Sequence, residues 1–323
     1  MKELYSRLVF DSNLVSPLVT IGIPAFKSGK LLNDAVCSAL CQNFDEPFEI
    51  LVVNDNPQGD DVTQLMMEYR KRGNVAYYMN AKNLGPTGNW NAMYALAKGQ
   101  YVVMLQDDDV LSPYYLKVMF RFMEETSYKY ELLYPQHYVS KKRDFSNLPI
   151  PPNRIRYRIM KYCDYLVTQW GLPTGLMIER TKYYQTGGYK NEFFPINDQE
   201  YIYRALHYVR GCQILFPMVL YYVGENLSLK PETLIQGIVK VREFNKMMHM
   251  DKSNIWHSFA PFCLRQQIVN MERWSRNFSN EIEEESRIKV GITCNSLKDK
   301  VSEIVCIFLK AYIKLVRFKS FNF

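Results

Sequence analysis

The stretch "YVVMLQDDDVLSP", residues 101–113, decides the fold. Apolar, β-prone residues lead into three consecutive aspartates, Asp107, Asp108 and Asp109, and a proline follows soon after. A continuous apolar run of this kind predicts a strand buried on both faces, as in a parallel sheet that helices cover. Because ligands of such sheets bind beyond the carboxyl ends of the strands, we expect the aspartates to point into a cleft.

Strand and helix patterns alternate on the amino-terminal side of this stretch. Strands are predicted at residues 18–26, 48–56, 75–80 and 101–106, and helices at 28–42, 60–73 and 88–100. The alternation is typical of a Rossmann-like, mostly parallel α/β sheet flanked by helices. Beyond it we expect a helix over 114–126, a loop over 140–160, a helix from about Asp198, a pair of strands within 213–223, and helices from about 232 onward.

Composition and charge narrow the class of protein. The 323 residues carry a net charge of +7 and are 47% hydrophobic, as expected for one large or two modest globular domains. Basic patches attract phosphates. No zinc-finger spacing, aromatic RNA-binding motif or basic zipper is found, so nucleic acid is not an expected partner.

The cysteines and the hydrophobic runs indicate the cellular compartment in which the protein is expected. Seven cysteines at irregular spacing do not predict a disulfide framework, and a reducing cytosol is the default expectation. The first residues, "MKELYSRLVFDSN", lack the apolar core of a signal peptide. No apolar run is long enough to predict a spanning helix.

Two common phosphate-binding motifs are missing. The sequence has neither G-x-G-x-x-G after a strand nor G-x-x-x-x-G-K-[ST], which argues against dinucleotide dehydrogenases and P-loop nucleotidases. The stretch "NLGPTGNWN" (83–91) opens a predicted helix, where backbone N–H groups would suit a diphosphate. A change from loop to helix is the more usual reason for such glycines.

Two acidic groups are candidates for chemistry. The triplet Asp107 to Asp109 is either a Mg²⁺ or Mn²⁺ site or a solvated turn, and the convergent strand ends favour the metal. In "PINDQEYIYRAL" (195–206), Asp198 begins a predicted helix. It is either a general base or a helix N-cap, and spacing alone leaves both open.

Four segments in order resemble the family 2 glycosyltransferases of the GT-A fold. They are "VTIGIPAFKSGKLLNDAVCSALCQ", "FEILVVNDN", "KNLGPTGNWNAMYALAKGQYVVMLQDDDVLSP" and "GGYKNEFFPINDQEYIYRAL", within residues 17–228. The resemblance implies an α/β GT-A catalytic domain over 1–228, followed by a helical region over 229–323. It also implies transfer of a sugar from a nucleotide donor with inversion at the anomeric carbon.

The resemblance also assigns roles to residues. Asp198 takes the place of the catalytic base, Asp108 that of the metal ligand with Asp109 supporting it, and Asp107 lies toward the ribose. The residues that match the nucleotide-binding positions are Pro24, Ala25, Phe26, Asp55, Asn83 and Gly85. Mn²⁺ or Mg²⁺ is the implied cofactor, and a UDP-sugar is the expected donor.

Several positions depart from the family pattern. Ala25 stands where the family has Thr, Gln106 where members commonly have Asp, Trp90 where many have Arg, and Asn197 where an acid precedes the base. The metal-binding His of the later loop is missing, and Glu225 is its candidate replacement. These departures leave a catalytically inactive nucleotide-sugar or glycan-binding module open, and a sugar-1-phosphate nucleotidyltransferase is the other alternative.

The acceptor and the location are expected from the family and from the tail. A saccharide or lipid-linked acceptor in surface polysaccharide or lipopolysaccharide synthesis is expected, at the cytoplasmic side of the membrane. Residues 301–323 combine a wide apolar face with a stripe of Lys and Arg, which favours binding to an anionic bilayer surface. The alternative is a helix packed on the catalytic domain with its cations outward. The sequence does not reveal which sugar is moved.

Overall fold

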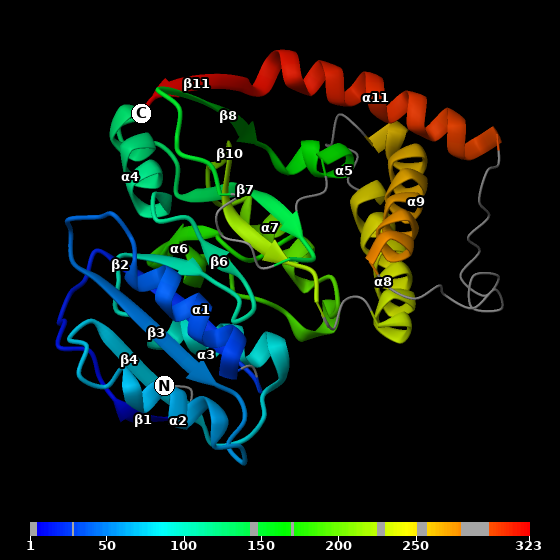
Figure 1. Ribbon diagram of the computed structural model, residues 1–323. Coiled ribbons are helices and arrows are strands. Elements are labelled where there is room, and N and C mark those ends of the chain that lie inside the picture. The colour runs from blue at the N-terminus through cyan, green and yellow to red at the C-terminus, as the bar shows by residue number, and fades with distance from the viewer. Residues whose placement is uncertain are drawn as a thin grey trace.

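The computed structural model describes residues 5–27, 29–142, 148–168, 171–224, 230–250, 257–278 and 297–323 (Figure 1). The strands are β1 (Ser6–Phe10), β2 (Val19–Ala25), β3 (Phe48–Asn54), β4 (Val75–Asn80), β5 (Tyr101–Met104), β6 (Val110–Leu111), β7 (Leu132–Ser140), β8 (Arg154–Met160), β9 (Met177–Glu179), β10 (Gly211–Tyr222) and β11 (Phe318–Asn322). The helices are α1 (Gly29–Leu40), α2 (Asp61–Glu68), α3 (Gly85–Leu96), α4 (Tyr115–Glu125), α5 (Tyr165–Thr168), α6 (Arg180–Gln185), α7 (Asn197–Ala205), α8 (Pro231–Met250), α9 (Ala260–Phe278) and α11 (Leu297–Arg317), with short 3₁₀ turns η2 (Tyr162–Asp164), η3 (Asn191–Phe193) and η5 (His257–Phe259).

One mixed sheet runs through the molecule. Its order is β1-β4-β3-β2-β5-β9-β7-β10-β8-β11, and β6 pairs with β10 off this path. The strands β4, β3, β2 and β5 are parallel neighbours, as the alternating pattern predicts. The antiparallel strand β9 lies between this half and the parallel pair β7 and β10. The expected α/β class with a mostly parallel sheet is therefore confirmed for its first half and extended by a mixed second half.

Helices cover both faces of the sheet because its central strands are apolar on both sides. Alternate residues of β3 enter different cores: Ile50 and Val52 pack toward α1, α2 and α4, whereas Leu51 and Val53 pack toward α3, α6 and α7. Every residue of β2 is buried. This two-sided burial fixes the direction of the strands and brings their carboxyl ends to one rim.

The carboxyl-terminal helices extend the second core. Residues of α8, α9 and α11 join the cluster of α3, α6 and α7, and α11 packs on α9 and α5 (Figure 1). The buried residues of α11 are Ser302, Cys306, Leu309 and Ile313, a narrow stripe at helical spacing. Its exposed side carries large apolar groups, with Leu315 84%, Phe308 72% and Ile304 54% exposed. The helix is thus packed on the domain, but with apolar rather than only cationic side chains outward.

The structure differs from the sequence-based expectation in several segments. The strands β7 and β8 lie where no strand was expected, and residues 211–222 form one long strand instead of a pair. The predicted tail helix ends at Arg317, because β11 then pairs antiparallel with β8. The boundary at residue 228 stays a prediction, although β11 belongs to the same sheet as the first domain.

Among the residues that the structure describes, no helix is both long enough and apolar enough to cross a membrane.

Candidate active site

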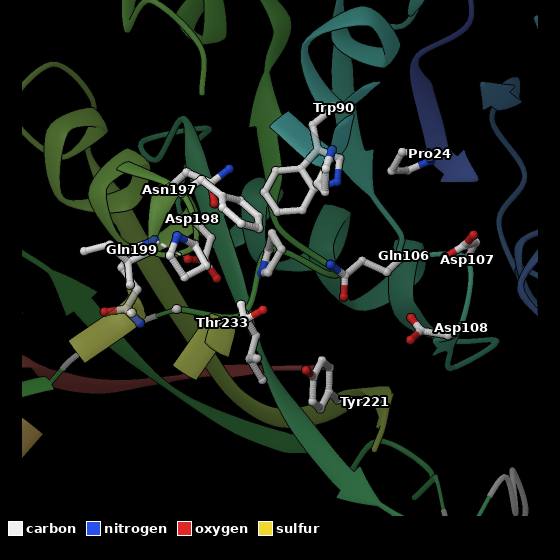
Figure 2. Close-up of a pocket in the computed structure, with 18 of the residues that line it drawn as sticks. Pro24, Trp90, Gln106, Asp107, Asp108, Asn197, Asp198, Gln199, Tyr221 and Thr233 are labelled. Atoms are coloured by element: carbon white, nitrogen blue, oxygen red, sulfur yellow. Dashed lines mark hydrogen bonds between the residues drawn. The ribbon is translucent and has the colours of Figure 1, made fainter. Parts of the chain in front are cut away.

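A cavity of about 1150 Å³ lies at the carboxyl ends of the parallel strands. Asp55, Asp107, Asp108 and Asp198 all line it, although they are far apart in the sequence. Figure 2 shows Asp107 and Asp108 on one side of this pocket and Asn197, Asp198 and Gln199 on the other, with Trp90 and Gln106 between them. The predicted convergence of the strand ends is therefore confirmed, while the chemical role of each residue stays a prediction.

Asp107 joins two neighbouring strand ends. Its Oδ2 accepts a hydrogen bond of 2.9 Å from the backbone N–H of Phe26, which follows β2. Phe26 is 45% exposed and lines the cavity with Pro24 and Ala25, so its ring is available to a planar ligand. Asp108 lines the same side of the cavity.

Asp55 is held in place by hydrogen bonds at the end of β3. Its Oδ1 accepts hydrogen bonds from Asn80 Nδ2 at 2.7 Å and from the backbone N–H of Leu84 at 2.8 Å. Burial raises the pKa of this carboxyl, and the two donors oppose the shift. The side chain is thus fixed, almost fully buried, and at the edge of the cavity.

Asp109 lies apart from its two neighbours. It is fully buried, its Oδ1 accepts a 2.8 Å hydrogen bond from the backbone N–H of Tyr222 on β10, and it is not among the residues that line the cavity. Burial, and then the charge of Asp108, raise its carboxyl pKa well above the usual value. A metal role for Asp109 stays a prediction; its contacts suit the support of Asp108 better than direct ligation.

The glycine-rich segment at the start of α3 also reaches the cavity, through Asn83 before the helix and Gly85 and Trp90 within it. Gly85 has φ +70°, a left-handed conformation that other residues rarely adopt. The backbone N–H groups of Leu84 and Gly85 donate to Asp55 and Asn83. These two donors are therefore already used, which weakens the expectation that this segment binds a diphosphate through its backbone.

Asp198 is positioned by the start of α7 and by the turn before it. Glu200 pairs with Arg204 at 2.6 Å, and Arg204 donates to the carbonyl groups of Thr186 and Gly188. This arrangement ties the Gly-Gly turn to the helix. Asn197 is anchored as well, because its Nδ2 donates to Thr87 Oγ1 at 3.0 Å.

The environment of Asp198 suits a base. Burial raises the pKa of its carboxyl from the ordinary 3.8 to about 7, and the backbone N–H of Gln199, which donates to Oδ1 at 2.7 Å, only partly offsets this. A carboxylate whose pKa lies near neutrality is well matched to proton abstraction at physiological pH. The competing interpretation as an N-cap finds no side-chain capping bond, since the cap residue of α7 is Ile196.

Several lining residues were not singled out from the sequence. They come from β7, β8 and β10: Tyr134, Gln136, His137, Arg158, Gln213 and Tyr221. Burial lowers the pKa of His137 to about 4, so the ring is neutral, and its Nε2 lies 2.7 Å from the carbonyl oxygen of Thr174. Only the alternation in "RIRYRIM" (154–160) would have predicted the orientation of Arg158.

The carboxyl-terminal helices form one wall of the cavity, through Thr233, Leu234 and Gly237 of α8 and Gln267 and Asn270 of α9.

Amide groups connect this wall to α7. Asn245 Nδ2 donates to Gln267 Oε1 at 2.8 Å, and Gln267 Nε2 lies 3.5 Å from Gln199 Oε1. Tyr165 also donates to Gln199 Oε1, at 3.0 Å. Gln199, the residue next to Asp198, thus contacts both Tyr165 of α5 and Gln267 of α9.

The residues present can be tested against the implied metal. Within the described ranges no cluster of three or more His, Cys, Asp or Glu side chains suits a metal ion. Mg²⁺ and related ions need only one or two carboxylates when substrate phosphates and water supply the other oxygens. Asp108, at the cavity wall, fits that requirement. Glu225 lies outside the described residues.

Residues 20–186 match the profile of glycosyl transferase family 2. The chain belongs to the family 2 glycosyltransferases. An uncharacterized glycosyltransferase of Rickettsia felis is 24% identical over 264 residues, which are 80% of this chain and 41% of that protein. This family 2 chain therefore spans less than half the length of that relative.

A second relative has a named reaction. The Escherichia coli protein WfaP, a UDP-Glc:alpha-D-GlcNAc-diphosphoundecaprenol beta-1,3-glucosyltransferase, is 27% identical over 184 residues. The match covers 57% of this family 2 chain and 66% of WfaP.

Solved structures support the fold. S. aureus TarS, residues 1–349 in complex with UDP-GlcNAc, superposes with a TM-score of 0.57 at 16% identity, covering 89% of this chain and 79% of that one. A Pyrobaculum calidifontis mannosyltransferase in complex with GDP-Man and Mn²⁺ gives 0.53 at 12% identity, covering 95% and 90%. The GT-A fold expected for a family 2 member is thus confirmed.

Proposed function

We propose that this protein transfers a sugar from a nucleoside diphosphate donor to a hydroxyl of a saccharide or lipid-linked acceptor, with inversion. One observation carries the proposal: Asp108 and Asp198 line opposite sides of a single cavity. Its volume of about 1150 Å³ exceeds the roughly 300–1,000 Å³ common for single ligands, which suits two substrates.

The donor occupies the side of Asp55, Asp107 and Asp108. Phe26 stacks on the base, the buried carboxylate of Asp55 accepts from it, and Asp107 faces the ribose. Asp108 would hold Mn²⁺ or Mg²⁺, which supplies positive charge to the leaving diphosphate when bound. Structural neighbours crystallised with UDP-GlcNAc, or with GDP-Man and Mn²⁺, support a nucleotide-sugar donor. A UDP-sugar remains the expected choice.

The acceptor occupies the side of Asp198. The carboxylate accepts the proton of the acceptor hydroxyl as its oxygen forms a bond to the anomeric carbon. The bond between that carbon and the diphosphate oxygen breaks, and its electron pair leaves with the nucleoside diphosphate. Attack from the face opposite the leaving group inverts the anomeric carbon. Trp90, between the two sides, would pack against a sugar ring.

The likeness to WfaP supports an acceptor linked to a lipid diphosphate, and such substrates lie at a membrane. The outward face of α11 supports docking there, because exposed Ile304, Phe308 and Leu315 lie beside Lys310 and Lys314. An anionic bilayer is complementary to both features. The cytoplasmic face of the membrane and surface polysaccharide synthesis remain predictions.

Donor binding tests the enzymatic proposal. The purified chain is heated with a panel of UDP-, GDP- and dTDP-sugars, with Mn²⁺ or with EDTA. We expect sugars of one nucleotide class to raise the Tm by several degrees, and only when Mn²⁺ is present. We also expect the protein to hydrolyse or transfer that donor. Stabilisation without turnover would indicate an inactive binding module. Pyrophosphate release from a nucleoside triphosphate would indicate a nucleotidyltransferase.

Vesicle flotation tests the docking proposal. Ile304, Phe308 and Leu315 are changed together to Ser, and binding to vesicles with anionic phospholipid should be lost. The matched control changes three exposed apolar residues elsewhere, Val15, Met67 and Ile150, to Ser. Equal flotation of both variants and the parent would refute the docking surface.

A further inference from the structure

A row of arginines lies along one face of β8. Arg154 and Arg156 are exposed and Arg158 is half-buried, whereas Ile155 and Tyr157 between them are buried in the core. Because side chains alternate along a strand, the arginines share the face opposite that core. The four residue steps from Arg154 to Arg158, at about 3.3 Å each, give the row a length of about 13 Å.

The inner end of the row reaches the large cavity. Arg158 lines it, donates through Nη2 to Gln213 Oε1, and packs its guanidinium 5.9 Å from the ring centre of Phe318. Strand register places Gln213 opposite both Arg158 and Tyr134. Burial lowers the pKa of Arg158 only to about 10, so it stays cationic at neutral pH.

The outer end reaches a second cavity, of about 790 Å³. Cationic and apolar side chains line it together: Arg154, Arg156, Lys314, Lys319, Ala311, Leu315 and Phe318, with Ser320. Figure 1 shows β8, β11 and the end of α11 side by side at this edge of the molecule. Leu315, 84% exposed, connects this cavity with the outward apolar face of α11.

Among the described residues, no acidic side chain forms an ion pair with Arg154 or Arg156, and the charge of Asp164 acts on Arg158. Asp164, which lies near Arg158, pairs with Arg317 at 2.9 Å. Arg154 donates to a hydroxyl, that of Ser320, at 2.8 Å. Guanidinium groups in such surroundings suit phosphate oxygens, to which they donate paired hydrogen bonds.

We infer that the row Arg154–Arg156–Arg158 binds the phosphate groups of an amphiphilic acceptor. Its lipid chain would lie on Leu315 and the outward face of α11, its phosphates on Arg154 and Arg156, and its saccharide beyond Arg158 toward Asp198. The inference rests on the proposed transferase function and specifies its acceptor as a lipid-linked phosphate or diphosphate.

Direct binding of probes tests this surface apart from catalysis. Calorimetry with EDTA present, to keep diphosphate from a metal at Asp108, compares farnesyl diphosphate, farnesol and inorganic pyrophosphate. The test variant carries Arg154→Gln and Arg156→Gln. The matched control carries Arg70→Gln and Arg72→Gln, exposed arginines beyond α2 with the same change in charge.

The expected result is selective. Farnesyl diphosphate should bind the parent and the control alike and the test variant at least about tenfold more weakly, since each arginine contributes charge-assisted hydrogen bonds. Farnesol should bind all three proteins equally. Equal affinity of test and control variants for farnesyl diphosphate would overturn the inference, as would an equal loss for farnesol.

Further measurements separate the possible sources of phosphate and the proposed function itself. If the parent binds pyrophosphate as tightly as farnesyl diphosphate, the lipid chain adds nothing and a free phosphate ligand replaces the lipid-linked one. If the test variant loses only flotation on anionic vesicles, the row binds bulk lipid headgroups instead. Donor stabilisation with Mn²⁺ is measured in parallel. Neither Arg154 nor Arg156 lines the large cavity. If the donor and Mn²⁺ failed to stabilise the parent, that result would therefore refute the transferase function but not the binding of phosphate by the row.

Discussion

The two sides of the large cavity are built in different ways. On the proposed donor side, carboxylates at strand ends accept hydrogen bonds from backbone N–H groups of neighbouring segments, as Asp107 does from Phe26 and Asp55 from Leu84. On the acceptor side, side chains bind side chains across separate helices, as Gln267 does with Asn245 and Gln199. The donor side is therefore part of the sheet, whereas the acceptor side depends on how the helices α7, α8 and α9 pack together.

The largest expected effect separates chemistry from donor binding. Asp198→Asn keeps the shape of the side chain and removes the base, so transfer should fall about 10²–10⁴-fold. Thermal stabilisation by donor and Mn²⁺ should match the parent, because the donor side is untouched. Transfer at a near-parental rate would show that another group takes the proton.

The second prediction tests the donor side. Asp108→Asn should weaken Mn²⁺ activation by at least about 10–100-fold, the loss typical even of residues that only support metal ligands. Asp109→Asn should have a smaller effect, because Asn can still accept the hydrogen bond from Tyr222. Mn²⁺ titration of donor hydrolysis measures both variants. A larger loss for Asp109→Asn would make Asp109 the principal ligand.

The third prediction concerns pH. A base acts deprotonated, and the pKa of Asp198 is raised to about 7, so kcat/KM should level off above pH 7 and fall toward tenfold per pH unit below it. Donor stabilisation should change less over pH 6–8. A flat kcat/KM across that range would contradict the role of Asp198.

The smallest effect should come from the packing of the helices. Gln267→Leu removes the amide contact from α9 to Gln199. One net hydrogen bond is worth about 0.5–1.5 kcal/mol, and a barrier raised by that amount corresponds to a kcat that is about two- to tenfold lower. Gln42→Leu removes a buried amide bonded to Ser112, outside this cavity, as a control. If both variants lower kcat equally, the loss reflects general stability and not the position of Asp198.

The sequence predicted well which strand ends meet at the cavity, for a physical reason. Each of the residues at these ends follows an apolar run, and parallel strands bring their carboxyl ends to one rim regardless of the intervening helices. Asp55 and Asp107 could therefore be placed from local patterns. Asp109 could not be separated from Asp108 in this way, because only the contact with β10 shows that it points away from the cavity.

The acceptor side was harder to predict. Asp198 was proposed as the base through the family resemblance, but its burial depends on packing that no local pattern encodes. The strands β7 and β8 were missed because prolines and charged residues interrupt their apolar pattern, and Arg158 was missed with them. The contacts of Gln267 arise from long-range docking of α9, which periodicity alone does not specify.

The pairing of β11 with β8 affects how this protein can be shortened. A chain cut before Phe318 would leave the backbone donors and acceptors of β8 open along one margin of the sheet, and such margins recruit other chains into aggregates. Point changes on α11, which leave β11 in place, are therefore better suited than deletions to the study of residues 301–323.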